Sequence, residues 1–428
     1  MIASFKPNTM KEHTAVKKKN IREPEKSRVD YEALESWARG KMQELIQELL
    51  EEEVQELLGR PKYERKKPVD AAEGYRNGYG KTRHLTLSCG TVELKRPRVR
   101  GLEQRFVSKI LPLFVRRTRE VGDLLPELYL HGLAEGDFEL ALRGLLGEKA
   151  PLSGSTVARL KEKWQAQYTQ WKRRSLQGLE VVYAWADGLY VKAGLEKEKA
   201  VVLTIVVALS DGSKEILYLG TGYRESKESW AEALRDLRSR GIEHIPLLVA
   251  DGNLGIWTAL PEVYPQAREQ RCWNHKELNV LDQIPRNKQA EAKLRLTTIP
   301  YSATRAEAEK AREIFESWCK QNGFSKAAEI LNNDWERMMT FYFFPKEHWV
   351  HIRTTNVVES PFAALRLRTD SAKRFKKVEN ATAVILKMLL VAEKRFRKLN
   401  APELLKDVHE GVEFVDGVAV TKKREAAA

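Results

Sequence analysis

The sequence predicts an α/β protein in which a sheet is interrupted by an all-helical insertion and preceded by a mostly helical region. Between residues 181 and 273, short apolar runs typical of strands alternate with helical patterns. On either side, in residues 31–178 and 285–345, apolar residues recur mainly at three- and four-residue steps, as in helices. The length of 428 residues exceeds one ordinary core, so we expect about two or three domains.

The composition indicates a polyanionic partner and a reducing compartment. The net charge is +14 and the pI is near 9.4, and neutralising phosphates with Lys and Arg releases counterions, which drives association. The three cysteines are too scattered for a disulfide framework: Cys89, Cys272 and Cys319. No apolar run approaches the roughly 20 residues that cross a bilayer, and residues 1–30 lack the apolar stretch of a secretory signal. We therefore expect a cytoplasmic protein with no membrane partner.

These patterns divide the chain into segments with different expected roles. They are a basic flexible tail (1–30), a helix and basic β-containing DNA-binding region (31–112), a helical, helix-turn-helix-like DNA-binding domain (113–178), the first part of the sheet domain (179–284), the helical insertion (285–345), the second part of the sheet domain with a basic helix (346–400) and a C-terminal tail (401–428).

The first segments combine a long helix with a basic surface. Tyr31 to Gly59 is amphipathic, and it either packs on its own domain or joins copies of the chain. Residues 74–80 are rich in turn residues, and residues 84–94 predict a hairpin that turns at Cys89-Gly90. Aromatics and glycines among the basic residues favour contact with the DNA backbone over a solvated loop. The predicted contacts are Arg76, Lys81, Arg96, Arg98 and Arg100, the last three in a run that trails off from the hairpin.

Residues 113–178 predict three helices, at 124–133, 138–146 and 155–168. Ser153 or Ser155 is a suitable N-cap for the third. Two short helices followed by a longer basic one suit a helix-turn-helix-like domain that reads DNA. Any small helical bundle would give a similar pattern, so this alternative stays open.

The segment after residue 179 predicts strands and helices in the order β-β-β-α-β-α-β. The strands are expected at 181–190, 200–210, 215–220, 245–250 and 270–273, and the helices at 227–240 and from 255. The wholly apolar run at 245–250 suits a strand buried on both faces. This order is that of a ribonuclease H-like core, which a helix beginning near Asn356 would complete after the insertion.

Three acidic residues occupy positions where such a core could bind divalent cations. Asp187 interrupts the first strand, Asp251 ends the buried strand, and Glu359 opens the late helix. Phosphoryl transfer on DNA uses two divalent ions about 4 Å apart, and Mg²⁺ prefers oxygen ligands. Asp187, Asp251 and Glu359 are therefore the candidate catalytic and metal-binding residues.

Each of the three also has a simpler explanation. An Asp before Gly is commonly a turn residue. Glu359 lies three residues after Asn356, the spacing of a capping box that would only complete the start of the helix. The combination is more specific than its members, because two Asp-Gly pairs end or interrupt apolar strands and the Glu leads into a basic segment.

The motifs around these residues resemble those of the Mutator-type bacterial insertion-sequence transposases. The spacing is similar, with 63 residues between the aspartates and 107 before the glutamate. So are Asp-Gly-Leu-Tyr at 187, Ala-Asp-Gly at 250, Arg-Cys-Trp-Asn-His at 271 and Arg-Thr-Thr-Asn-Val-Val-Glu-Ser at 353, together with Glu-Val-Gln-Glu-Leu-Leu-Gly-Arg and Gly-Tyr-Arg-Asn-Gly-Tyr nearer the start. The resemblance runs from about residue 35 to about residue 400.

The resemblance implies an Asp-Asp-Glu triad at Asp187, Asp251 and Glu359, with a helical insertion ahead of the glutamate. It implies DNA strand cleavage and joining that depend on Mg²⁺, with Mn²⁺ able to substitute, at terminal inverted repeats and target DNA. It also implies a circular intermediate and a nucleoid-associated bacterial enzyme. Since two DNA ends must be brought together, a homodimer or larger homo-oligomer is expected.

Cys272 and His275 allow two interpretations. With His348 and His351 they could form a four-ligand zinc site, although the gap of about 70 residues is unlike compact zinc modules. The resemblance instead makes Cys272 and His275 a signature beside the active site. His275 could then contact the scissile phosphate or position a carboxylate, and a buried structural histidine is the third alternative.

Further DNA contacts are predicted around Glu359. From Pro361 to Asn400 there are 11 Lys or Arg and 3 Asp or Glu. Trp349 is the candidate for stabilising a base flipped out near the cleavage site, with Arg353 close by. The basic candidates that could clamp phosphates near the metals are Arg366, Arg368, Lys373, Arg374, Lys376 and Lys377.

Three other functions fit parts of this sequence. A DNA-binding regulator could keep the fold without the chemistry, a structure-specific nuclease would cut branched DNA without joining strands, and a zinc-containing DNA-binding module would hold stoichiometric zinc.

Overall fold

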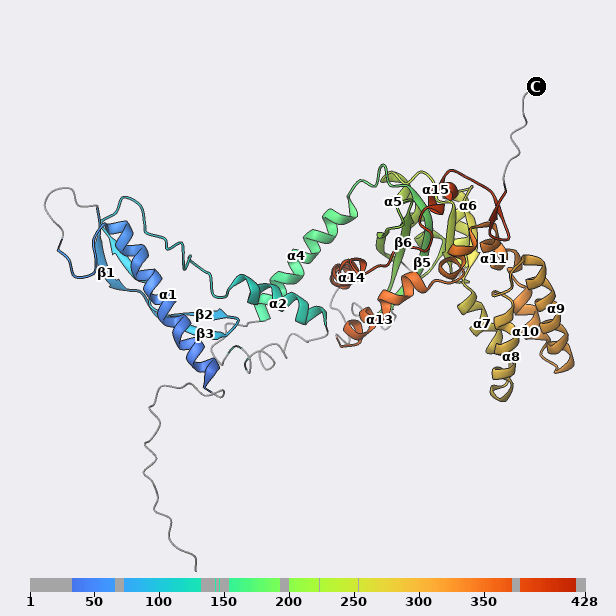
Figure 1. Ribbon diagram of the computed structural model, residues 1–428, viewed down its shortest axis with the longest axis horizontal. Helices are drawn as coiled ribbons and strands as arrows, with labels where there is room; N and C mark the ends of the chain where they lie inside the picture. Colours follow the sequence, from blue (N-terminus) through green and yellow to red (C-terminus); the bar gives the residue numbers. More distant parts are fainter. Residues whose placement is uncertain are drawn as a thin grey trace, which may run out of the picture. The chain divides into compact units, whose positions relative to one another are not determined.

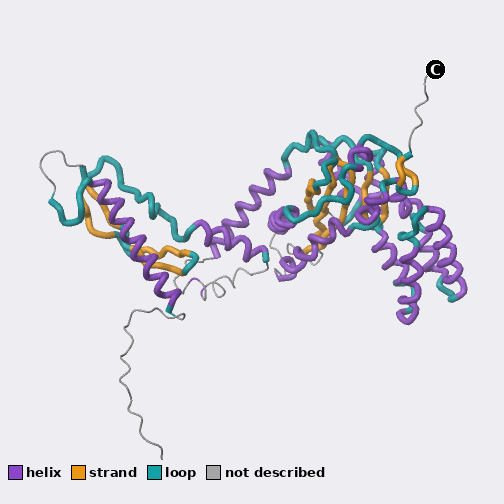
Figure 2. The backbone as a smooth tube through the Cα atoms, viewed as in Figure 1, coloured by secondary structure: helices purple, strands orange, loops and turns teal. Residues whose placement is uncertain are grey.

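The computed structural model describes residues 33–65, 73–131, 143, 146, 154–192, 200–222, 224–252, 254–371 and 378–420 (Figures 1 and 2). The chain forms two compact units. We call residues 1–118 with 145–151 the N-terminal unit, and residues 119–144 with 152–428 the C-terminal unit. The expected tail at 1–30 and the expected helix at 138–146, apart from Arg143 and Leu146, lie outside the described residues.

The N-terminal unit packs one long helix on two small antiparallel sheets. Helix α1 (Leu34–Leu58) ends at Gly59, which adopts φ 61° as its C-cap. The predicted hairpin is confirmed as β2 (Arg83–Leu87) and β3 (Gly90–Leu94). Leu50 of α1 packs into a core with Leu85, Leu87, Val92, Leu94 and Leu111. Large apolar side chains elsewhere on α1 stay exposed, including Leu34, Trp37 and Leu45, and the oligomer interpretation of this helix stays a prediction.

Two parts of this unit differ from the sequence prediction. Residues 74–80, expected as turns, contain β1 (Tyr75–Tyr79), and the basic run expected to trail off contains β4 (Pro97–Arg100). These strands pair antiparallel, with a register shift between Arg76 and Tyr79. Gly78 lies in that shift with φ 60°. This glycine therefore permits an irregularity within a strand and does not mark a turn.

The C-terminal unit is built on one five-stranded mixed sheet. Its strands are β5 (Val181–Val191), β6 (Ala200–Leu209), β7 (Lys214–Gly222), β8 (Leu247–Ala250) and β9 (Arg268–Arg271). They lie in the order β7-β6-β5-β8-β9. The first three are mutually antiparallel, and β8 and β9 continue parallel to β5. The predicted strands of the mixed sheet are therefore confirmed, although Trp273 already belongs to the next helix.

Helices cover both faces of this sheet (Figure 2). On one face, α5 (Lys227–Ser239) and α6 (Leu254–Val263) share a core with Ala184 and Ala186 of β5. On the other face, the side chains of Tyr183 and Trp185 reach the segment around His348 and His351. Helix α13 (Asn356–Ser371) packs against β5 and β6, and α14 (Val378–Glu393) against β7.

The segment between β9 and α13 is helical, and it extends beyond the expected insertion at 285–345 on both sides. It consists of α7 (Trp273–Leu281), α8 (Arg286–Thr298), α9 (Arg305–Gln321), α10 (Ser325–Asn332), α11 (Trp335–Met339), two 3₁₀ turns, η1 (Thr340–Phe343) and η2 (Lys346–His348), and α12 (Trp349–Ile352). In Figure 1, α8, α9 and α10 lie side by side in a small bundle. Helix α11 and η1 attach this bundle to β9 at the edge of the sheet.

Other helices of this unit flank the sheet domain. Of the expected DNA-reading helices, α2 (Arg119–Leu130) and α4 (Gly154–Lys172) are described, and both contact α14. The segment expected as a C-terminal tail contains α15 (Leu404–His409), which packs on β5, and the strand pair β10 (Phe414–Val415) and β11 (Val418–Ala419). None of the described helices has the length and apolar composition that a membrane crossing requires.

Candidate active site

The first candidate carboxylate lies within the central strand of the sheet. Asp187 is paired with Thr204 of β6, and β5 continues without a turn to Val191. The turn interpretation of Asp187-Gly188 is therefore wrong. The Gly188 N–H donates to Asp187 Oδ1 at 2.8 Å, which fixes the carboxylate on the strand.

The second candidate lies at the end of the neighbouring strand. Asp251 follows β8 directly, and the parallel register places Ala186 opposite Ala250. Asp187 and Asp251 each directly follow a residue of this pair. Their backbones therefore lie side by side on adjacent parallel strands. The Asp251 carbonyl accepts the Trp257 indole N–H at 3.1 Å, which ties the loop to α6.

The third candidate reaches the same place from α13. Glu359 is in the first turn of this helix, and the Thr355 hydroxyl donates to its Oε1 atom. Among the described hydrogen bonds, the Asn356 N–H donates to Thr354 Oγ1 at 3.5 Å. It makes none to the Glu359 carboxylate, as a capping box would require. The carboxylate therefore faces Thr355 and the site, not the predicted capping position.

The charges of Asp251 and Glu359 act on Asp187. Burial is the main cause that raises the pKa of Asp187 to about 7; the Gly188 hydrogen bond opposes it, and the charges of Asp251, Glu359 and Glu225 add to it. A divalent cation would offset this repulsion, and an all-carboxylate donor set is one that Mg²⁺ accepts. The residues present therefore fit Mg²⁺.

A fourth carboxylate, Glu225, was missed by the sequence analysis. It lies between β7 and α5, is 9 % exposed, and hydrogen-bonds to Tyr190. A Cβ atom on Gly188 would overlap the Glu225 carboxylate, and one on Gly255 would overlap its backbone. The sequence held one signal for Glu225, the glycine at 188 inside the predicted strand. A glycine inside a strand can indicate that another group lies close to the backbone there.

Cys272 and His275 lie beside the carboxylates. Cys272 directly follows β9, its N–H donates to the Ala250 carbonyl at 2.8 Å, and its sulfur accepts from the Thr355 N–H at 3.3 Å. The hydrogen bond with Cys272 raises the pKa of His275 to about 9, helped by the charges of Glu359 and Asp251 and opposed by burial.

The zinc set proposed from the sequence is not formed. His348 Nδ1 hydrogen-bonds to the Tyr183 hydroxyl at 2.7 Å, and His351 Nε2 accepts from the Asn400 N–H at 3.3 Å. Among the described residues, the one group of three potential ligands within 4.8 Å of one another is Cys272, His275 and Glu359. Asp187, Asp251 and Glu359 do not form such a group.

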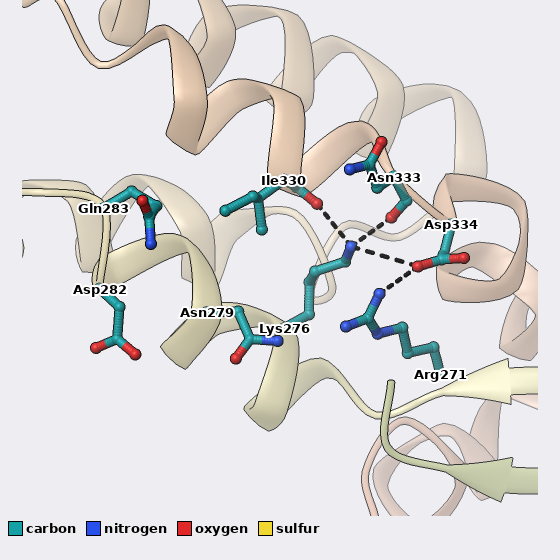
Figure 3. A pocket seen from close by; sticks show the side chains of 8 residues that line it. All are labelled: Arg271, Lys276, Asn279, Asp282, Gln283, Ile330, Asn333 and Asp334. Carbon is teal, nitrogen blue, oxygen red and sulfur yellow. Dashed lines mark hydrogen bonds and ion pairs between the residues drawn. The ribbon is translucent and has the colours of Figure 1, made fainter. Parts of the chain in front are cut away.

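A buried ion cluster supports the loop after Asp251. Arg271 and Lys276 both contact Asp334, and Lys276 also donates to the Ile330 carbonyl at 2.6 Å (Figure 3). A Cβ on Gly252 would overlap the Arg271 guanidinium, so this arginine links the loop to the insertion. The adjacent pocket of about 380 Å³ is lined by this cluster and not by the three candidate carboxylates.

Two predicted DNA contacts have structural roles instead. Trp349 is 5 % exposed, its indole N–H donates to the Phe344 carbonyl at 2.8 Å, and its ring packs on Phe341 and Tyr342. It therefore offers no free ring face to a flipped base. The sequence alone does not distinguish a tryptophan that stacks on a DNA base from one that packs in the hydrophobic core. Arg353 donates to the Trp349 and Pro300 carbonyls and lies 4.3 Å from the Tyr301 ring.

The other predicted contacts divide by exposure. Arg76 is paired with Glu51 at 2.8 Å, and Arg96 is half-buried. Lys81, Arg98, Arg100 and, on α13, Arg366 are exposed. Arg368 belongs to α13, but its side chain lies outside the described part, as do Lys373, Arg374, Lys376 and Lys377.

The chain is similar in sequence to known transposases. A family model described as "Transposase, Mutator family" matches residues 10–398. The transposase for insertion sequence element IS6120 of Mycolicibacterium smegmatis is 39% identical over 297 residues, 69% of this chain and 92% of that protein. The transposase for insertion sequence element IST2 of Acidithiobacillus ferrooxidans is 41% identical over 280 residues, 65% of this chain and 94% of that protein. The chain is therefore an enzyme of the transposase class. It belongs to the Mutator family of insertion-sequence transposases.

Proposed function

We propose that this transposase binds the terminal inverted repeats of its insertion sequence and cuts and joins DNA at an Asp-Asp-Glu site that holds Mg²⁺. Mn²⁺, which also accepts oxygen ligands, is expected to substitute. One observation carries the proposal: Asp187 and Asp251 follow paired residues of adjacent parallel strands, and the charge of Glu359 from α13 acts on Asp187.

The sheet and its helices are proposed to be a ribonuclease H-like core. The strand order β7-β6-β5-β8-β9 supports this, with three antiparallel strands followed by two parallel ones. So does the position of the acids, one inside the central strand, one after the next strand and one on a helix beyond an insertion.

Each residue of the site has a defined task in this mechanism. The chemistry that a bound pair of Mg²⁺ ions would supply is activation of the attacking oxygen and stabilisation of the leaving oxygen. Asp187, inside β5, and Asp251, directly after β8, would hold them, and Glu359 would complete the set from α13. His275, protonated because its pKa is about 9, places a positive charge beside the scissile phosphate.

The proposed reaction needs no covalent link to the protein. Water attacks the phosphodiester at a transposon end, and the leaving 3′ oxygen takes up a proton. The freed 3′-OH then attacks a second phosphodiester, displacing its leaving oxygen. The family resemblance supports a circular DNA intermediate. Joining two ends in one complex requires a homodimer or larger homo-oligomer, and the exposed Lys81, Arg98, Arg100 and Arg366 are suited to phosphate contacts.

Cleavage and joining of end-containing DNA by purified protein with Mg²⁺ test the proposal. The expected result is cleavage at the inverted repeats that is lost in Asp187→Ala while end binding persists. Cleavage by Asp187→Ala would contradict the site. Cutting of branched DNA without preference for the ends would favour a structure-specific nuclease, and binding without cleavage by the wild type would favour a regulator.

A further inference from the structure

A second donor set lies beside the carboxylates and differs from them in chemistry. Potential ligand atoms of Cys272, His275 and Glu359 lie within 4.8 Å of one another. A sulfur, an imidazole nitrogen and a carboxylate oxygen are three protein ligands of the kind that hold Zn²⁺ with one position open. Mg²⁺ favours oxygen ligands and is poorly matched to the sulfur and the imidazole.

The backbone brings these ligands together from separate elements. Cys272 is the N-cap of α7, and His275 lies in its first turn. Glu359 lies in the first turn of α13. The three ligands thus come from the N-terminal ends of two helices, and the Thr355 N–H donates to the Cys272 sulfur at 3.3 Å. The thiolate is the form of cysteine that binds metals.

The Thr355 hydroxyl marks the point that all three ligands face. Its oxygen lies 3.1 Å from the Cys272 sulfur and 3.5 Å from His275 Nδ1, and it donates to Glu359 Oε1. An ion bound by the three ligands would take this place after the Thr355 side chain rotates away. His275 and Glu359 have side chains 34% and 31% exposed, which leaves a path from solvent.

We propose that Cys272, His275 and Glu359 form a binding site for a thiophilic divalent cation such as Zn²⁺. Binding replaces the proton of Cys272 and any proton on His275, which pass to solvent, and involves no oxidation. The ion engages Glu359, so it withdraws this carboxylate from the Mg²⁺ site and inhibits cleavage. The inhibition rests on the proposed function, whereas the binding does not.

Titration of the full-length protein with Co²⁺, without DNA or Mg²⁺, tests the site. Cobalt bound to a thiolate absorbs by sulfur-to-metal charge transfer, so the expected result is one such site per chain that Zn²⁺ displaces. Cys272→Ser should abolish the band, and His275→Gln should weaken binding at least about tenfold. Cys89→Ser is the matched control and should leave the band unchanged, since Cys89 lies in the other unit.

Two more variants make the outcome decisive. Thr355→Ala removes the hydroxyl that occupies the position and should bind Co²⁺ at least as tightly as the wild type. Asp187→Asn should lose cleavage but keep the cobalt band, which separates this site from the proposed function. A band that survives Cys272→Ser, or cobalt bound without any sulfur band, overturns the site. Undiminished Mg²⁺-dependent cleavage with one equivalent of bound Zn²⁺ overturns the inhibition.

Discussion

The two units of this transposase present charge in opposite ways. In the C-terminal unit, Asp187 and Asp251 are fixed by adjacent strands, and burial raises the pKa of Asp187 to about 7. In the N-terminal unit, Arg98 and Arg100 are exposed on β4, and Lys81 is exposed in the loop between β1 and β2. A buried site concentrates function in a few irreplaceable side chains, whereas an exposed basic surface spreads it over many. Substitutions should therefore have large, specific effects in the first and small, additive effects in the second.

The largest expected effect is on catalysis by the acid triad. Asp251→Asn or Glu359→Gln should lower Mg²⁺-dependent cleavage by about a thousandfold or more, because metal ions contribute several kcal/mol of charge stabilisation. Cleavage rates on end-containing DNA measure this. Asp211→Asn is the matched control, since Asp211 lies in an exposed turn of the same sheet, and a comparable loss there would contradict the account.

The buried ion cluster should give the largest effect on stability. Asp334→Asn leaves Arg271 and Lys276 buried without their shared carboxylate, so we expect a loss of about 3–5 kcal/mol in the free energy of unfolding. Urea denaturation measures it. The control is Glu336→Gln, which breaks the Arg305 pair at an exposed position and should cost about 1 kcal/mol or less. Equal losses in the two variants would contradict the expected difference between the buried and the exposed ion pair.

Asp187 should make the metal-free protein less stable as the pH rises. Its pKa is raised to about 7 from the model-peptide value of 3.8, so the folded state holds the proton more tightly than the unfolded state. The stabilising contribution is complete below about pH 4 and is lost as the pH approaches 7. Asp187→Asn should therefore stabilise the protein at pH 8 by about 4 kcal/mol and by little at pH 4. Unfolding curves at both pH values without divalent ions test this, and a pH-independent difference would refute it.

A glycine and a glutamate should show coupled effects. Gly188→Ala places a methyl group where Glu225 lies, and such overpacking costs about 1–3 kcal/mol. Glu225→Ala removes the obstacle, so the double variant should be more stable than the sum of the single changes predicts. Additive unfolding free energies would show that Glu225 does not occupy this space in solution.

The smallest individual effects are expected on the basic surface of the N-terminal unit. Replacing Lys81, Arg98 and Arg100 one at a time by Ala should weaken binding to different DNA sequences about equally. Each loss should reduce the slope of log affinity against log salt by about 1. Filter binding at several salt concentrations measures both quantities. A large, sequence-specific loss from one substitution would place base recognition here.

The sequence predicted most of the sheet but less of what surrounds the site. Alternating and apolar runs are local signals, so the five strands and the positions of Asp187 and Asp251 could be recognised. Glu225 could not, because it lies between elements where no periodicity marks it. Its one signal, Gly188, was equally compatible with a turn. Trp349 was misplaced because its burial depends on contacts with Phe341 and Tyr342, which the sequence does not reveal.

The most direct test of the account is a change of metal preference in Asp187→Cys. A thiolate at this position is a poor ligand for Mg²⁺ but an acceptable one for softer ions. If Asp187 holds a catalytic ion, the variant should fail to cleave end-containing DNA with Mg²⁺ and regain measurable cleavage with Mn²⁺. Wild-type rates with Mg²⁺ alone would contradict the assignment.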